Sequence, residues 1–217
     1  MKRKAGLILI ILGLALILGA AGWAGYNLWD ENRAKESSEK ALNQLIERLP
    51  EMILTEEKET KDPVAELGTP ATEVVYPDYV LDPTMEMPVQ EIDGHEYVGI
   101  LSIPTLDMEL PILSAWSYEG ASISPCRYSG SAYLDDLVIA AHNHRAHFGP
   151  LLNDIRLEDA VTFTDVDGNV FSYRVVEFQV VEPTQIDEMI TGEWDLTLFT
   201  CNPGMLTRLA VRCEKVE

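Results

Sequence analysis

A chain of 217 residues is long enough for one ordinary domain with accessory segments, and a hydrophobic content of 47% allows that domain a packed core. The formal net charge of −20 argues against a nucleic acid as partner, because a phosphate backbone requires a basic protein face. An acidic exterior otherwise keeps a protein dispersed and indicates little about its substrate.

The N-terminus is predicted to anchor the chain in a membrane. Basic residues at 2–4 precede an uncharged apolar run at 5–29, which would span roughly 37 Å as a helix, against about 30 Å of bilayer hydrocarbon. The end of the run carries aromatic residues typical of an interfacial belt, namely Trp23, Tyr26 and Trp29. The positive-inside rule places the N-terminus in the cytoplasm and the rest outside. We expect residues 1–29 to be a cytoplasmic basic stub and a single-pass anchor; a signal peptide cleaved near 20–22 is the alternative.

A polar region at 30–90 is expected to separate the anchor from the folded domain. Residues 30–49 are typical of a polar helix that Pro50 ends. The stretch 51–90 is acidic, contains prolines and lacks a sustained period, which is typical of a spacer. Its last part, 76–90, contains aromatic and apolar residues and could dock on the domain as a lid.

Residues 91–217 have the pattern of an all-β domain. Short apolar runs are separated by turns, and Asp167-Gly168 is a hairpin signal. Such closely spaced short strands predict a closed barrel or a sandwich. Short helices are plausible near 118–123 and 148–153. The predicted strands are 97–103, 110–113, 137–141, 161–163, 170–176, 196–200 and 208–212.

Cys201 is the first candidate for chemistry. It ends an apolar strand and begins a turn that contains Pro203-Gly204, so its side chain is expected at a strand end. A thiolate there would be a nucleophile. The alternative is a small buried hydrophobic residue, which describes most free cysteines. The chain has two other cysteines, Cys126 and Cys213. Because three is an odd number, at least one thiol stays unpaired within the chain, and the sequence does not decide whether Cys126 and Cys213 form a disulfide.

His142 is the second candidate, because it directly follows the apolar run 137–141 and is also expected at a strand end. An imidazole can exchange protons with a thiol and a leaving amine near neutral pH. The alternative is a hydrogen-bonded surface histidine. His144 and His147 lie close by, so a zinc site is a further possibility to consider. No carboxylate accompanies these histidines in a hydrolase-like pattern, and we therefore predict no metal and no cofactor.

Arg208 is the third candidate, because it opens the strand after the turn that follows Cys201. Residues that flank a tight hairpin turn lie close across the strands. A guanidinium there could stabilise an oxyanion or keep a thiolate ionised, or it could form an ordinary cross-strand ion pair. Arg212 shares the same face of the strand, and only nearness to Cys201 favours Arg208.

Together these segments resemble the sortase family. Thr197-Leu198-Phe199-Thr200-Cys201 matches the TLxTC signature of the family at every fixed position. The run 207–212 is similar to the strand that carries the active-site arginine, and 138–143 is similar to the strand that ends in the catalytic histidine. Ala141 departs from the glycine that usually precedes this histidine. The likeness covers roughly 97–213. Asn143 and Phe148-Gly149 resemble the class B branch and favour a class B-like member, while Asp82-Pro83 is a weak match to the lid motif of pilin-type members.

The resemblance implies a sortase-like eight-stranded β-barrel with short helices at 91–217, preceded by the transmembrane helix and linker. It implies a cysteine transpeptidase at the surface of a Gram-positive cell, with Cys201, His142 and Arg208 as catalytic residues. Thr200 and Asn143 would support the oxyanion or the substrate, and the residues around 181–194 would read the substrate motif.

The implied partners are surface proteins with a C-terminal sorting signal and the amine of a cell-wall precursor or a pilin. A thioacyl enzyme would be the intermediate. Three alternatives stay open: a secreted thiol protease, an inactive surface binding module with the same fold, and a metal-binding hydrolase.

Overall fold

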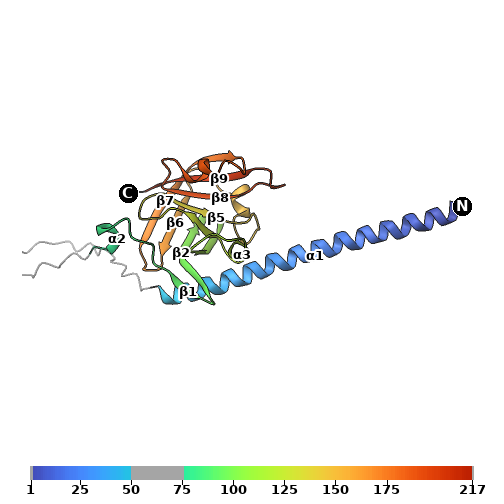
Figure 1. The fold of residues 1–217 in the computed structure, drawn as a ribbon, viewed down its shortest axis with the longest axis horizontal. Coiled ribbons are helices and arrows are strands. Elements are labelled where there is room, and N and C mark those ends of the chain that lie inside the picture. The colour runs from blue at the N-terminus through green and yellow to red at the C-terminus, as the bar shows by residue number, and fades with distance from the viewer. Residues whose placement is uncertain (1, 50–75, 217) are drawn as a thin grey trace, which may run out of the picture.

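The computed structural model describes residues 2–49 and 76–216 of the chain. Within these residues the C-terminal part of a long N-terminal helix lies along one side of a β-barrel, and the rest of the helix projects beyond the barrel (Figure 1). The predicted spacer at 51–75 and the helix-ending Pro50 lie outside the described residues.

Eight strands form a closed barrel, as the resemblance implies, and one of them, β4, was not among the predicted strands. The order around the barrel is β2-β3-β4-β5-β8-β9-β7-β6, and β6 pairs with β2 to close it. A ninth strand, β1 (Gln90–Ile92), forms a hairpin with β2. The barrel strands are β2 (His95–Ile103), β3 (Met108–Leu113), β4 (Cys126–Ser129), β5 (Leu137–Ala140), β6 (Ala160–Asp165), β7 (Val170–Val181), β8 (Leu196–Cys201) and β9 (Arg208–Lys215).

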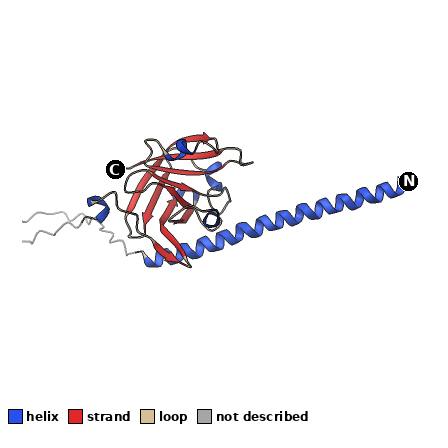
Figure 2. Cartoon of the chain, viewed as in Figure 1, coloured by secondary structure: helices blue, strands red, loops and turns tan. Residues whose placement is uncertain are grey.

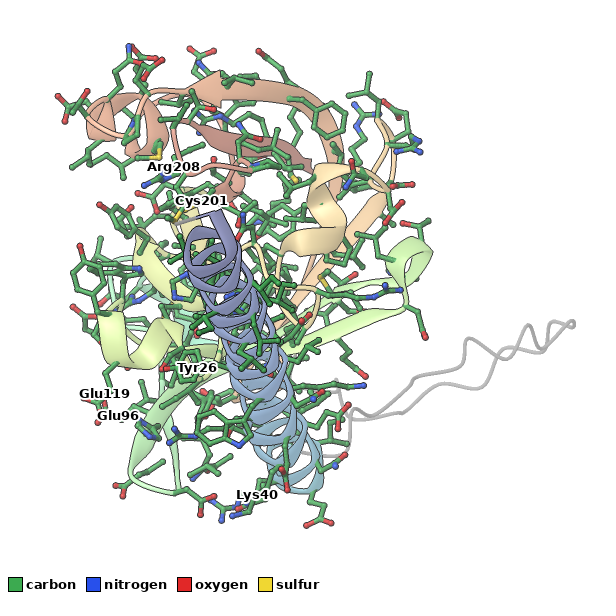
Figure 3. The ribbon with its side chains drawn as sticks, turned by 90° about the vertical axis from the view of Figure 1, so that its right-hand side faces the viewer. Tyr26, Lys40, Glu96, Glu119, Cys201 and Arg208 are labelled. Atoms are coloured by element: carbon green, nitrogen blue, oxygen red, sulfur yellow. The ribbon has the colours of Figure 1, made fainter. Side chains whose placement is uncertain are left out.

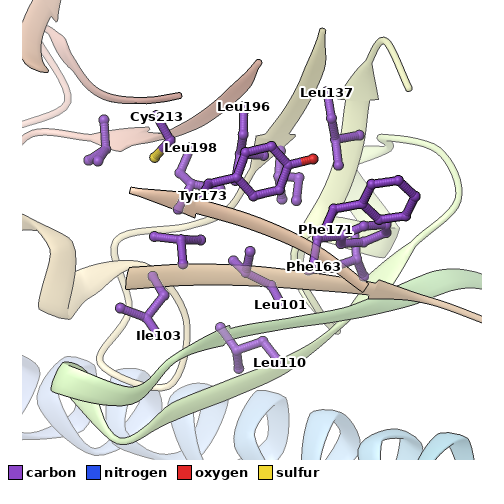
Figure 4. Close-up of a cluster of buried hydrophobic side chains, with 14 of the residues drawn as sticks. Leu101, Ile103, Leu110, Leu137, Phe163, Phe171, Tyr173, Leu196, Leu198 and Cys213 are labelled. Carbon is purple, nitrogen blue, oxygen red and sulfur yellow. The ribbon is translucent and has the colours of Figure 1, made fainter. Parts of the chain in front are cut away.

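The strand patterns explain which faces are buried. In the first half of β7, Phe171, Tyr173 and Val175 point into the core while the alternate residues are exposed, as in a strand with one solvated face. β5 is buried along its whole length, which fits its continuous apolar sequence. The side chains inside the barrel come from most of its strands and form one contiguous core (Figure 4).

The N-terminal helix α1 (Lys2–Arg48) is continuous through the predicted anchor and the predicted polar helix. Its part from Ile10 onward is long and apolar enough to cross a membrane, by length and composition. Farther along, Ala34, Ala41 and Leu45 are buried, and this part of α1 contacts β1, β2 and β3. The polar helix is therefore attached to the barrel through its narrow apolar face.

Short helices lie outside the barrel wall (Figure 2). The two expected near 118–123 and 148–153 are present as α3 (Tyr118–Ala121) and the 3-10 helix η2 (Gly149–Leu152). The remaining ones are α2 (Asp78–Leu81), η1 (Pro104–Leu106) and α4 (Ile186–Ile190).

The segment 76–90 docks on the barrel, as its aromatic and apolar residues suggest. Tyr79 stacks on Tyr133 with ring centroids 4.6 Å apart, and Met87 is buried in the core. These contacts are made away from the cavity that contains Cys201, whose lining includes no residue of 76–90. A lid over that cavity stays an untested prediction.

Candidate active site

The end of β8 places Cys201 at the rim of the barrel. Cys201 is partly exposed and pairs with Arg208, the first residue of β9, across the hairpin. The backbone N–H of Asn202 donates to the carbonyl of Thr207 (2.9 Å), and its side-chain amide donates to the hydroxyl of Thr207 (2.8 Å). Because the turn is closed by these bonds, the thiol and the guanidinium are held on neighbouring strands at the same end of the barrel.

A parallel pairing brings His142 to the same end. β5 runs parallel to β8, with Ala140 opposite Phe199. The next N–H, that of Ala141, donates to the carbonyl of Phe199 (3.2 Å), and the Thr200 hydroxyl donates to the carbonyl of Ala141 (2.8 Å). Because β5 and β8 run parallel with Ala140 opposite Phe199, His142, two residues after Ala140, lies at the level of Cys201, two residues after Phe199.

The loop after His142 is a compact turn. The N–H of Phe148 donates to the carbonyl of His142 (3.1 Å), and the N–H of Gly149 donates to the carbonyl of His144 (2.8 Å). A Cβ at position 149 would lie 2.6 Å from that His144 oxygen, so the turn requires glycine there. The rings of His142 and His144 stack with centroids 5.2 Å apart, and His147 is fully buried behind them.

One cavity of about 260 Å³ contains all three predicted catalytic residues. Cys201, His142 and Arg208 line it, although they come from three different strands or strand ends. Figure 3 shows Cys201 and Arg208 close together at one end of the barrel. The guanidinium of Arg208 also donates to the carbonyls of Met205 and Thr207 (3.3 Å each), which tie it to the turn.

Four aromatic side chains that line this cavity were not predicted from the sequence, and they form an aromatic wall. Trp116 packs edge-on against Tyr118 and Tyr128, with centroids 4.7 Å and 5.9 Å apart, and Tyr128 packs edge-on against Phe199 (5.1 Å). All four rings line the cavity. The aromatic residues at and before the start of the predicted helix at 118–123 were the available signal, but their spacing does not reveal that they line the same cavity as Cys201.

The segment predicted to read the substrate contributes the third side of the cavity. Pro183, Ile186 and Met189 line it, from α4 and the turn before it. An apolar cavity with a few convergent polar groups at one rim is the usual form of a binding site.

The other residues singled out from the sequence, Thr200, Asn143 and Arg212, differ in their position relative to the cavity. Thr200 lines the cavity, but its hydroxyl is engaged with the Ala141 carbonyl, so it connects the strands that carry Cys201 and His142. Asn143 lies outside this cavity and lines a different depression together with Gly149 and Asn153. Arg212 is buried and does not line the cavity, whereas Arg208 does.

The three thiols have different environments. All are free, so Cys126 and Cys213 form no disulfide. Burial raises the pKa of Cys126 to about 11 and that of Cys213 to about 12, which keeps both protonated at neutral pH. Cys201 differs from them because it is partly exposed in a cavity beside an imidazole and a guanidinium. Among residues 2–49 and 76–216, no group of three or more His, Cys, Asp or Glu is arranged to hold a metal ion.

The comparisons with known proteins identify the family of this chain. A thiol, an imidazole and a guanidinium that line one cavity on a closed β-barrel are the arrangement expected of a cysteine transpeptidase. The model of the sortase domain matches residues 101–216, so the chain belongs to the sortase family. A search of curated proteins found no match.

Solved structures of sortases share the fold. Sortase A from Corynebacterium diphtheriae is 25% identical, with a TM-score of 0.50, over 57% of this chain and 62% of that one. The pilus-related sortase C of Group B Streptococcus is 24% identical, with a TM-score of 0.50, over 63% of this chain and 78% of that one. Sortase C1 from Streptococcus suis is 25% identical, with a TM-score of 0.49, over 57% and 74%. The expectation of a class B-like member stays a prediction.

Proposed function

We propose that this sortase cleaves a C-terminal sorting signal of surface proteins at Cys201 and transfers the new carboxyl end to an amine. The observation that carries the proposal is the single cavity lined by Cys201, His142 and Arg208. β8 pairs with β5 in parallel and with β9 antiparallel. These two pairings hold the groups on rigid strands, as a nucleophile with an acid–base partner requires.

In the first half-reaction the Cys201 thiolate attacks the carbonyl carbon of a Thr-Gly or similar bond. The guanidinium of Arg208 stabilises the oxyanion that forms. When the C–N bond breaks, His142 as imidazolium gives its proton to the leaving amine, and the acyl group stays on sulfur as a thioester. Thr200 supports this geometry by holding the end of β5 against β8. Asn143 lines a separate depression, so a role in substrate support would be exerted there and not at the oxyanion.

In the second half-reaction an acceptor amine attacks the thioester. His142, now neutral, takes a proton from that amine, a new amide bond forms, and the Cys201 thiolate leaves. The acceptor is an amine of a cell-wall precursor or a pilin lysine. One of the similar structures is a pilus-related sortase C, which makes a pilin acceptor reasonable for this chain.

The proposed location is the surface of a Gram-positive cell. α1 would cross the membrane once with its basic N-terminal residues in the cytoplasm, because positively charged flanks stay on that side. The barrel would then lie outside, where sorting signals are exposed.

The test is cleavage of a fluorogenic sorting peptide by the full chain. Cys201→Ala should abolish cleavage, and Arg208→Ala should lower kcat/KM by about 10²–10³ without unfolding the barrel, because it removes the donor to the oxyanion. Arg174→Ala is the matched control, since Arg174 is an exposed arginine on β7. Undiminished cleavage by Cys201→Ala would refute the proposal.

Two further measurements separate the alternatives. Product analysis with and without an added amine distinguishes transfer from hydrolysis by a thiol protease. Alkylation of Cys201 at neutral pH distinguishes an active enzyme from a binding module, in which this thiol would be inert.

A further inference from the structure

Arg212 is a buried cation that has no place in the proposed chemistry. It lies on β9 opposite Thr197 of β8 and Glu177 of β7, and only 1% of the residue is exposed. It does not line the cavity that contains Cys201. Burying a charge is costly unless it is fully hydrogen-bonded, so this position calls for a physical reason.

The guanidinium uses all of its donors. Nε and Nη2 donate to the side-chain oxygen of Gln179 (3.1 and 2.6 Å). Nη1 donates to the Thr197 hydroxyl (2.9 Å) and to the backbone carbonyl of Met189 (3.2 Å), while Nη2 also donates to the carbonyl of Glu188. A guanidinium has five N–H groups in a fixed planar fork, and each one has an acceptor here.

These acceptors are neutral oxygens. Among the described residues, no ion pair within 4 Å involves Arg212, and burial lowers its pKa from the ordinary value. An apolar side chain would fill the same place without desolvating a charge. What an apolar side chain cannot do is bind two backbone carbonyls and two side chains of the barrel wall at once.

The two carbonyls belong to the wall of the active-site cavity. Glu188 and Met189 lie in α4, a helix of five residues. The last carbonyls of a helix accept no hydrogen bond from an N–H of the same helix, so they are available to Arg212. The side chain of Met189 lines the cavity, as do Ile186 of the same helix and Pro183 before it. Arg212 therefore connects α4 to β7 and β8 from behind.

We propose that Arg212 is a positioning residue that fixes α4 on the barrel and thereby sets the shape of the surface that binds the sorting signal. The inference rests on the proposed function. Arg212 acts through the backbone of α4 and does not touch the reacting atoms, so its loss should weaken substrate binding more than the chemical step.

The experiment compares Arg212→Met, Arg212→Lys and Gln179→Met with the control Arg174→Met in the full chain. Arg212→Met should raise KM for the sorting peptide about tenfold or more while kcat changes less than about threefold. Arg212→Lys keeps the charge but loses the fork, so an intermediate KM is expected. Amide hydrogen exchange should become faster at 183–194 in the Arg212 variants, while alkylation of Cys201 keeps its rate.

Each outcome decides the inference. Unchanged KM and unchanged exchange at 183–194 in a folded Arg212→Met would overturn it, and so would a fall in kcat with a slower alkylation of Cys201. If Arg212→Met does not fold, Gln179→Met, which removes one acceptor near the surface, should still raise KM and exchange in the same direction. Absence of sorting activity in the unmodified protein would refute the proposed function alone, because the exchange measurement needs no substrate.

Discussion

The three cysteines show how the environment of a residue decides its chemistry. Cys126 and Cys213 are fully buried, and burial raises the pKa of both thiols, to about 11 and about 12. Cys201 lies at a strand end in an open cavity. A thiolate is the reactive form, so these environments predict different reactivities.

Iodoacetamide at pH 7.5 should therefore label one thiol per folded chain and three per unfolded chain. The labelled residue should be Cys201, and a Cys201→Ser protein should take up no label until it is denatured. Peptide mass spectrometry gives the position. Labelling of Cys126 or Cys213 in the folded protein at a similar rate would contradict the prediction.

His147 is a buried titratable residue behind the site. Burial, together with the neighbouring His144 and His142, lowers the pKa of His147 to about 4. Its folded-state pKa thus lies below the ordinary value near 6.5, so protonation favours the unfolded chain.

The contribution of His147 to the free energy of unfolding should consequently be constant above about pH 6.5. It should fall as the pH decreases toward 4. The loss should reach on the order of 3 kcal/mol, measured by urea unfolding at a series of pH values. His147→Gln should flatten this part of the profile. His95→Gln, which changes a histidine on β2, should leave it in place; equal flattening by both variants would show that His147 is not the cause.

At the scale of elements, the closure of the barrel depends on a close approach of two strands. β2 pairs with β3 on one side and β6 on the other, and Gly99 lies opposite Asp165 of β6. A Cβ at position 99 would lie 2.2 Å from the carbonyl oxygen of Thr164 and 2.9 Å from the Cα of Asp165. Both neighbours are backbone atoms of a paired strand, so neither can move without disturbing the ladder.

Gly99→Ala should lower the free energy of unfolding by about 2–3 kcal/mol through this overpacking. The matched control is Gly94→Asn in the β1–β2 turn, where a Cβ would meet nothing within 4 Å and asparagine tolerates the positive φ of 80°. Urea unfolding of both proteins is the measurement. A Gly99→Ala protein as stable as the parent would mean that the two strands separate more easily than their pairing suggests.

At the scale of the whole molecule, α1 connects the predicted membrane segment directly to the barrel. Leu45 is 1% exposed between α1 and the barrel, the Lys40 ammonium pairs with Asp93 (2.7 Å), and the Arg48 guanidinium donates to the Glu91 carbonyl (2.9 Å). The view from the side on which α1 leaves the barrel also shows Cys201 and Arg208 (Figure 3). The docked part of the helix thus connects the barrel to the predicted membrane segment through one continuous helix.

Leu45→Asp should release this part of α1, because it replaces a buried apolar contact with an unpaired charge. We expect faster amide hydrogen exchange at 34–48 and a loss of about 3 kcal/mol in the free energy of unfolding. Ile46→Asp is the matched control, since Ile46 is the next residue and 47% exposed. Similar exchange in the two variants would indicate that α1 is not held by this face.

Much of the fold and of the candidate site could be predicted from local sequence. The apolar runs of β5 and β8, the turn at Pro203-Gly204 and the uncharged run at 5–29 are local patterns that indicate strands, a turn and a helix. Cys201, His142 and Arg208 stood out because each lies at the end of such a pattern.

Only the tertiary structure decided which distant residues share a surface. The aromatic wall around Trp116 and Tyr128, the separation of Asn143 from the cavity, and the burial of Arg212 behind α4 depend on strand pairings between segments far apart in the chain. The sequence by itself determined seven of the eight barrel strands and the reactive groups, because these follow from neighbouring residues, whereas β4 was not among the predicted strands. The closed barrel determined the cavity, because its walls come from β5, α4 and the β8–β9 hairpin together.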